Sequence, residues 1–182
     1  MNTGIFQTSA NMRELNTLLE SEFKVKSAIR SFSNYQVSLN YPAIEGSKAS
    51  IADIKRRSIE FLQKKEGVAY VVDMEEAQTT NIPAVYRERI INGYNRERSG
   101  VIQIVLKPAW YSGSGLAPTG ATHGTASPDD IHIPFVLMGW GIKHGTTNVS
   151  HNMTDIAPTI TGLLRIQEPN GNIGKAVNEA YK

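Results

Sequence analysis

Cysteine is absent from the 182 residues, which excludes disulfide bonds, thiolate metal sites and cysteine nucleophiles. No apolar run approaches the roughly 20 residues that a transmembrane helix needs. The first residues also lack the basic and apolar regions of a signal peptide, so a signal, if the full-length protein is exported, is expected upstream. The net charge is only +2, and the basic residues form no strong cluster. We therefore expect no nucleic-acid partner and no membrane segment.

What the chain does contain is an ordinary globular composition, with 40% hydrophobic and 20% charged residues. The spacing of apolar residues predicts a helix over 11–23, which Asn11 would cap. Alternating residues predict a strand or hairpin over 28–41, and a second helix is expected from about 51 to 65. A short apolar strand over 68–72 follows. Residues 1–80 therefore read as a small α/β layer, with helices over a sheet.

The remainder, residues 81–182, continues the α/β pattern. A helix is expected over 82–94 and a buried strand over 101–106, whereas the Gly/Ser/Pro-rich stretch 110–119 reads as a loop. The apolar run 135–138 predicts a second buried strand. With the strand over 101–106, it would belong to the main sheet of a larger α/β sandwich.

Asp155 directly precedes the last predicted helix, and a structural role as the N-cap of this helix explains it. Pro158 would then be the third helical residue, where a missing N–H costs nothing. The apolar residues of this helix are expected to form its buried face: Ile156, Ile160, Leu163 and Leu164.

Each charged residue on the helices can be interpreted as functional or as an ordinary structural residue. Lys55, Arg56 and Arg57 could face a phosphate, but a solvated helix face is favoured. Glu75 and Glu76 read as acids near a helix N-terminus rather than as a catalytic pair.

His123 is the candidate metal ligand. From the residue alone, a loop histidine usually makes an ordinary hydrogen bond. The small neighbours of this one, in the run GATHG, would let a metal approach its ring nitrogen to about 2.0–2.1 Å. His132 is predicted to have a structural or supporting role beside Asp130. His144 and His151 lie in polar stretches and read as surface residues.

Four motifs carry a resemblance to a known family: Gly-x-Thr-His at 120–123, Asp-x-His-Ile-Pro at 130–134, Met-Gly-Trp-Gly-Ile-Lys at 138–143 and Met-Thr-Asp-Ile-Ala-Pro-Thr at 153–159. The chain resembles the alkaline phosphatase superfamily, specifically the zinc-dependent bacterial alkaline phosphatases that look like nucleotide pyrophosphatase/phosphodiesterases. Weaker matches extend to nearly the whole chain, and the resemblance covers only the C-terminal part of such an enzyme. Because the motif at Met1 matches the family's interior, a truncated sequence is expected.

The resemblance implies a phosphate ester substrate, a Thr or Ser nucleophile and two zinc ions roughly 4 Å apart. It places His123 where the family has a zinc-ligating histidine, and it implies a periplasmic or secreted parent protein. The nucleophile and the other ligands would lie upstream. No Asp-x-x-x-His or Asp-His-Gly motif occurs around the five aspartates, which are Asp53, Asp73, Asp129, Asp130 and Asp155. One imidazole does not hold a catalytic zinc, so we expect the chain by itself to be inactive and not to bind zinc stably.

Three functions follow from these observations. The leading one is the C-terminal portion of a zinc-dependent phosphomonoesterase. The second is the same portion of a phosphodiesterase or nucleotide pyrophosphatase, since the residues that separate the two lie upstream. The third is a stand-alone, non-catalytic α/β interaction module. We also expect exposed strand edges, through which the isolated chain could dimerise.

Overall fold

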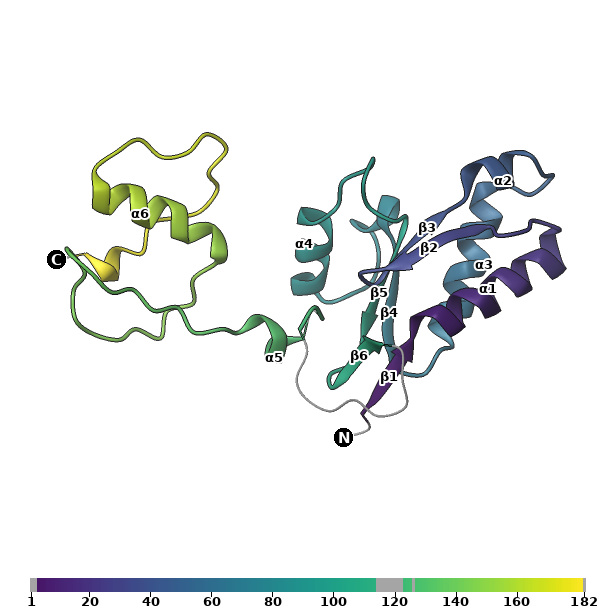
Figure 1. The fold of residues 1–182 in the computed structure, drawn as a ribbon, viewed down its shortest axis with the longest axis horizontal. Helices are drawn as coiled ribbons and strands as arrows, with labels where there is room; N and C mark the ends of the chain where they lie inside the picture. Colours follow the sequence, from purple (N-terminus) through teal and green to yellow (C-terminus); the bar gives the residue numbers. More distant parts are fainter. Residues whose placement is uncertain (1–2, 114–122, 126, 182) are drawn as a thin grey trace. The chain divides into compact units, whose positions relative to one another are not determined.

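A computed structural model describes residues 3–113, 123–125 and 127–181 of the chain (Figure 1). The side chains of Pro128 and Asp129 lie outside this description. The chain divides into two compact units, the first ending at His132 and the second beginning at Ile133. Among the described residues, no helix combines the length and apolar character needed to cross a bilayer.

A four-stranded antiparallel sheet forms the centre of the first unit. Its strands are β2 (Ile29–Ser33), β3 (Gln36–Leu39), β5 (Ile102–Leu106) and β4 (Val68–Asp73), in that spatial order. The hairpin and both later strands were predicted. The neighbours of β5 were not, because it pairs with β3 and β4 rather than with a strand near 134–138. An apolar run indicates burial, but it does not indicate which strands lie beside it.

Helices cover both faces of this sheet. On one face lie α1 (Thr8–Phe23) and α3 (Ile51–Gln63), whose apolar residues join the main core, including the fully buried Leu15, Leu19, Ile54 and Leu62. On the other face, α4 (Ala84–Asn92) packs Tyr86 against Tyr70, with ring centroids 5.9 Å apart. The short helix α2 (Tyr41–Glu45) was not predicted from the sequence.

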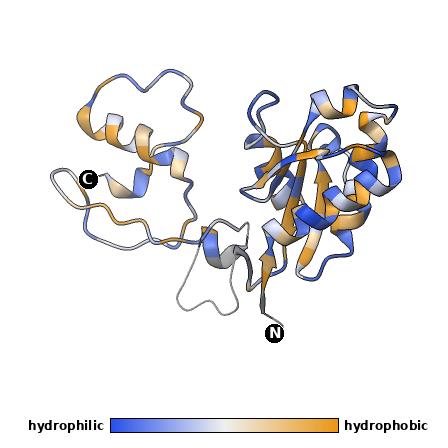
Figure 2. Ribbon diagram, turned by 45° about the vertical axis from the view of Figure 1, so that its right-hand side comes forward, coloured by the Kyte–Doolittle hydropathy of each residue, from blue (hydrophilic) through white to orange (hydrophobic). Residues whose placement is uncertain are grey.

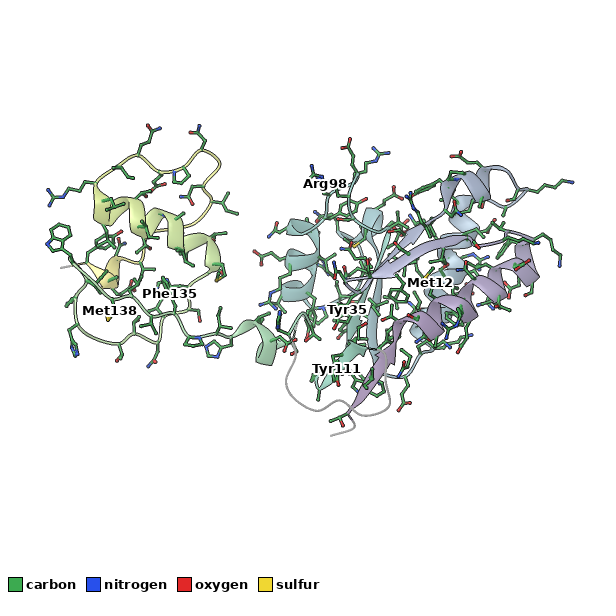
Figure 3. All side chains as sticks on the ribbon, viewed as in Figure 1. Met12, Tyr35, Arg98, Tyr111, Phe135 and Met138 are labelled. Carbon is green, nitrogen blue, oxygen red and sulfur yellow. The ribbon has the colours of Figure 1, made fainter. Side chains whose placement is uncertain are left out.

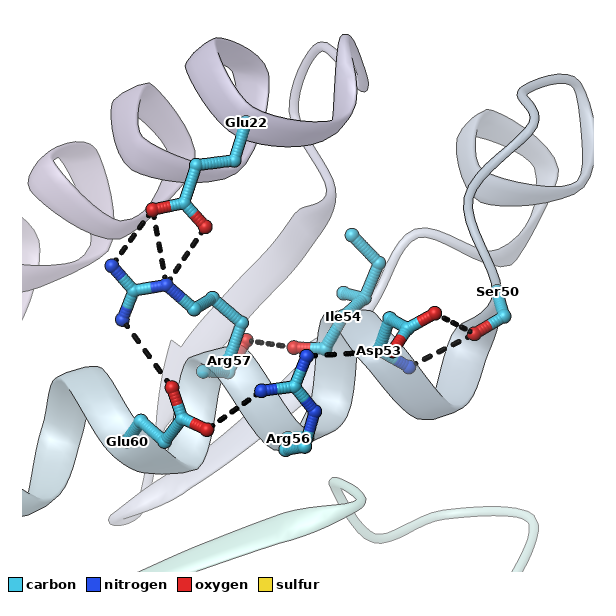
Figure 4. Close-up of polar contacts among 8 residues, drawn as sticks. Glu22, Ser50, Asp53, Ile54, Arg56, Arg57 and Glu60 are labelled. Carbon is cyan, nitrogen blue, oxygen red and sulfur yellow. Dashed lines mark hydrogen bonds and ion pairs between the residues drawn. The ribbon is translucent and has the colours of Figure 1, made fainter.

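The starts of the two long helices differ in how they are capped. Ser50 caps α3, as its side chain accepts a 3.0 Å hydrogen bond from the Asp53 backbone N–H (Figure 4). The predicted cap of α1 at Asn11 is wrong. The helix begins at Thr8, and the Asn11 side chain donates to the backbone oxygen of Gln7 at 2.9 Å.

A second, two-stranded sheet contains the chain's parallel strands. β1 (Gly4–Gln7) pairs with β6 (Trp110–Gly113), with Gly4 opposite Trp110. The loop predicted over 110–119 is therefore wrong in its first four residues, and its remainder lies outside the described residues. The glycine and serine residues of this stretch are typical of a loop. Strand β6 forms here only because it pairs with β1, more than a hundred residues away in sequence.

The second unit contains α6 (Ile156–Leu164), preceded by a 3-10 turn, Met153–Asp155, and followed by a tail with a 3-10 turn at Asn178–Ala180. Asp155 directly precedes α6 and Pro158 is its third residue, as predicted. The Asp155 side chain makes no capping hydrogen bond to α6, however, and instead forms a capping box with Asn152. The predicted buried face is wrong: Ile160 is 45% and Leu164 is 61% exposed, whereas Thr159 and Thr161 are buried. Apolar residues of this unit are exposed, among them Val136, Met138 and Ile173. Figure 2 colours the ribbon by hydropathy.

The strand predicted over 135–138 is also absent from the second unit. These residues have no assigned secondary structure, and Val136 is 83% exposed. A strand exists only when a neighbour completes its hydrogen bonds. The sequence pattern thus indicates a preference for burial that this chain does not satisfy at this position.

Candidate functional site

His123 follows the carboxyl end of the small parallel sheet. β6 ends at Gly113, and residues 114–122, which join it to His123, lie outside the described ranges. The neighbouring strand β1 ends at Gln7 and leads directly into α1. The carboxyl ends of parallel strands are where α/β proteins usually bind ligands. The side chain of His123 is exposed.

The hydroxyl groups of Tyr35, Ser112 and Thr8 lie close together at the ends of strands β1 and β6. The phenol oxygen of Tyr35 accepts a 3.1 Å hydrogen bond from the backbone N–H of Ser112, and the Ser112 hydroxyl is hydrogen-bonded to that of Thr8. Gly124 lies near the same ring, because a Cβ built on it would be 3.9 Å from Tyr35 Cε2. These contacts connect the residue after His123 to the ends of both strands. Figure 3 labels Tyr35 and Tyr111 in this region.

The loop after His123 is held by Asp130. Its carboxylate accepts hydrogen bonds from the backbone N–H of Thr125, at 2.8 Å, and from the Thr125 hydroxyl. The predicted pairing of Asp130 with His132 is therefore wrong. His132 is exposed and follows the short helix α5 (Pro128–Ile131) instead of starting a buried strand. Of the predicted small neighbours of His123, Gly120, Ala121 and Thr122 lie outside the described residues.

The residues around His123 do not complete a metal site. Within the described ranges, no group of three or more His, Asp or Glu side chains could hold an ion. A catalytic zinc normally takes three protein ligands. His123 is thus able to contribute one ligand, but the donors described in this chain do not fit a zinc ion without others.

His151 was predicted to lie at the surface, and this prediction is wrong. Its side chain is 17% exposed and lies between two carboxylates, with Nδ1 3.8 Å from Asp155 and Nε2 4.0 Å from Glu179. The Nε2 atom is buried and has no hydrogen-bond partner among the described residues. The four-residue spacing of His151 and Asp155 could have indicated their proximity. His144 is exposed, as predicted.

Asp155 connects three segments of the second unit. Its carboxylate accepts hydrogen bonds from the backbone N–H groups of Asn152 and Lys175, both at 2.9 Å. These two bonds, Asn152 first, hold the pKa of Asp155 below the ordinary value of an aspartate. The role of this motif residue is therefore to fasten the C-terminal tail to the start of α6.

The proposed solvated face of α3 requires one correction. Arg56 and Arg57 are paired with carboxylates, Arg56 with Glu60 and Arg57 with Glu22 (Figure 4). Lys55 was expected to face solvent but is only 9% exposed.

The buried Lys55 ammonium lies 2.7 Å from Asp73 and 2.6 Å from Glu75. Burial lowers the pKa of Lys55, but these hydrogen bonds outweigh it, so the pKa lies above the ordinary value. The spacing of apolar residues along the helix does not indicate that Asp73 and Glu75 lie opposite Lys55.

No family model matches the chain. Among curated proteins, it is 49% identical over 181 residues to "Calcium-transporting ATPase" of Myroides odoratus and 42% identical over 169 residues to "Alkaline phosphatase PhoV" of Synechococcus elongatus. It is 38% identical over 179 residues to "Alkaline phosphatase PafA" of Elizabethkingia meningoseptica. These matches cover 93–100% of the chain but only 30–33% of the relatives. The chain thus spans about a third of their length.

Solved structures give the same result. The wild-type PafA crystal structure superposes with a TM-score of 0.92 at 38% identity, covering 100% of this chain and 34% of that one. A substituted variant of PafA gives a TM-score of 0.91.

Proposed function

Because the chain is homologous to part of the bacterial alkaline phosphatases PhoV and PafA, with the α/β fold of the matching part of PafA, we propose that it is the C-terminal portion of a zinc-dependent phosphomonoesterase. In that enzyme, His123 supplies one zinc ligand. The substrates are phosphate esters, and the parent protein is periplasmic or secreted. The boundary predicted between residues 80 and 81, a cap-like layer followed by core, belongs to this proposal.

The observation that carries the proposal is similarity along the whole chain, with a TM-score of 0.92 against PafA. A local motif match would leave the fold open, but this similarity covers 100% of this chain. The exposure of His123, and the position of the adjacent Gly124 near the Tyr35 ring beside β6, support its role, because a ligand must be accessible to the ion.

No catalytic step is assigned to the residues of this chain. The described donors do not make a zinc site by themselves, so the remaining ligands and the nucleophile belong to the other part of the enzyme. When bound, zinc activates a nucleophile and stabilises a leaving oxygen. The contribution of this chain is to hold His123 at the strand ends, with Asp130 fixing the loop that follows it.

Two alternatives remain as outcomes of the test. A phosphodiesterase or nucleotide pyrophosphatase would use the same third of its chain and would differ in its substrate and in residues upstream of this chain. A stand-alone interaction module would require neither zinc nor His123.

The experiment uses the isolated chain and a chimera in which this chain replaces the matched third of PafA. We expect no turnover of an aryl phosphate by the chain alone, and zinc-dependent turnover by the chimera. His123→Ala should lower chimera turnover by more than the roughly 10–100-fold typical of supporting residues. His144→Ala, also an exposed histidine, is the control and should have no effect. Preference of the full-length parent enzyme for a diester would favour the second alternative, because the residues that separate the two activities lie outside this chain. A well-folded chimera indifferent to His123→Ala would contradict the proposal.

A further inference from the structure

The dipeptide Asn-Gly occurs twice in the chain, at Asn92-Gly93 and at Asn170-Gly171. Its glycine has no Cβ, so the backbone nitrogen of the glycine is able to approach the side-chain carbonyl carbon of the asparagine closely. Attack of that nitrogen on that carbon is the first step of asparagine deamidation. The two positions are equivalent in sequence, but they lie in different structural surroundings.

Asn170 and Gly171 form the tip of an exposed turn in the second unit. The backbone N–H of Asn172 donates to the Pro169 oxygen at 3.2 Å, and Gly171 has φ +76°. A positive φ at the third position of a turn is a conformation that glycine adopts without strain. Both residues at the tip are exposed, and a Cβ built on Gly171 would have nothing within 4 Å. The turn therefore has room to change its conformation.

The two reacting groups of this turn are also free of hydrogen bonds. Among the described residues, neither the Gly171 N–H nor the Asn170 side chain has a hydrogen-bond partner. Rotation about the Asn170 backbone and side-chain bonds is thus able to bring the nitrogen and the carbonyl carbon together without breaking a hydrogen bond of either group. Exposed loop tips are where covalent changes of a chain are most easily accommodated.

The other dipeptide is held at the end of α4. Asn92 is the last residue of that helix, and Gly93 is its C-cap with a helical backbone conformation. The Gly93 N–H donates to the backbone oxygen of Arg89 at 2.9 Å. Because the reaction removes this hydrogen, the helix end must open before the nitrogen can attack. The same dipeptide is therefore protected in the first unit and unprotected in the second.

We propose that Asn170 is a site of spontaneous deamidation. The Gly171 nitrogen loses its proton and forms a bond to the side-chain carbonyl carbon of Asn170, and that carbon releases its amino group, which takes up the proton and leaves as ammonia. Water then opens the resulting succinimide ring at either carbonyl, giving aspartate or isoaspartate at position 170. The step uses water alone, and the inference does not depend on the proposed function.

The two products should affect the turn differently. Both add a negative charge two residues after Glu168, whose carboxylate accepts a 2.9 Å hydrogen bond from the Asn172 side chain. Isoaspartate also lengthens the backbone by a carbon atom, so the bond from the Asn172 N–H to Pro169 should no longer close. Further along the tail, the Lys175 N–H donates to Asp155 at 2.9 Å. We therefore expect the change to stay within the turn.

The test is incubation of the full chain at mildly alkaline pH, followed by peptide mass spectrometry of both dipeptides. Asn170 should convert at least about fivefold faster than Asn92, roughly the ratio that corresponds to one hydrogen bond. In urea that unfolds the chain, the two rates should become similar. Hydrogen exchange of the Gly93 amide in the same sample shows whether α4 is folded. If that amide is unprotected in the chain alone, the PafA chimera gives the same comparison in a full-length enzyme.

Two variants separate the steps. Gly171→Ala should lower the Asn170 rate to that of Asn92 or below, because the added Cβ restricts the approach of the nitrogen. Asn170→Asp adds the charge without the longer backbone, so its Asn172 amide should exchange as in the fresh chain, whereas isoaspartate should speed this exchange. In folded protein, an Asn170 that converts no faster than Asn92 would overturn the inference, and so would conversion at Asn170 that Gly171→Ala does not slow.

Discussion

The indole ring of Trp110 packs directly on the backbone of Gly67. A Cβ built on Gly67 would lie 2.0 Å from Trp110 Cε3, and one built on Gly4 would lie 2.5 Å from the ring's Cη2. Trp110 itself is 7% exposed. One side chain thus connects the start of β6 with the starts of β1 and β4, and the two glycines provide the space that it occupies.

Gly67→Ala should therefore destabilise the first unit strongly. The added methyl would overlap the indole, and the backbone at Gly67 has φ +81°, a conformation unfavourable for other residues. Overpacking typically costs about 1–3 kcal/mol, and the left-handed conformation adds about 1–2 kcal/mol. The free energy of unfolding from urea titration is the measurement. Gly171→Ala is the matched control, since Gly171 has φ +76° with nothing within 4 Å. Equal losses at the two sites would show that the contact with Trp110 is unimportant.

Lys55→Ala should also weaken the first unit. The substitution leaves Asp73, whose side chain is 15% exposed, without its cation. Breaking a buried ion pair typically costs about 3–5 kcal/mol. Replacing both partners, as in Lys55→Met with Asp73→Leu, should recover much of the loss. Arg56→Ala removes an exposed pair on the same helix and should leave chemical denaturation unchanged. A double variant no more stable than Lys55→Ala would argue against the ion pair as the cause.

The second unit should lose stability in acid through Asp155. Its pKa is lowered in the folded state, so its contribution is present above about pH 4. That contribution is lost as the pH falls through the folded pKa. Hydrogen exchange of the Lys175 amide, which donates to Asp155, reports this directly. Asp155→Asn should speed exchange at neutral pH and flatten the acid dependence, whereas the exposed Glu168→Gln should change neither. An unchanged profile in Asp155→Asn would assign the acid sensitivity to another group.

His123→Ala should leave the chain's stability within about 0.5 kcal/mol of the original, because surface substitutions rarely do more and the side chain is exposed. The comparison is of chemical denaturation midpoints for the chain alone. Combined with lost turnover in the chimera, this result would separate a ligand role from a structural one. A large loss of stability would instead make His123 part of the fold.

Much of the first unit could be predicted from the sequence. The hairpin over 28–41, the helix over 51–65 and the strands at 68–72 and 101–106 have periodic or continuous apolar patterns that depend on nearby residues alone. Strand β6 could not be predicted, because its glycine and serine residues become a strand only beside β1. The family resemblance was carried by short motifs, and the comparisons confirm it.

Part of the candidate site was likewise predicted from the sequence, and part was found only in the structure. The small residues around His123 identified it as a candidate from the sequence, whereas its place beyond the parallel strands and the contact of Gly124 with Tyr35 came from the fold. The carboxylates that lie beside Lys55 and His151 were not predicted. The position of each carboxylate depends on how separate segments pack.

The sequence by itself determined the α/β class, the main helices and strands of the first unit and the relationship to alkaline phosphatases. It also named His123 as a candidate ligand, which stays a prediction. Those properties depend on residue order and on spacing within a few turns. Only the tertiary structure decided which strands pair, which charges are buried and which apolar residues stay exposed. Residues 135–138 illustrate the reason, because a strand is completed by its neighbours and these residues have no strand partner among the described residues.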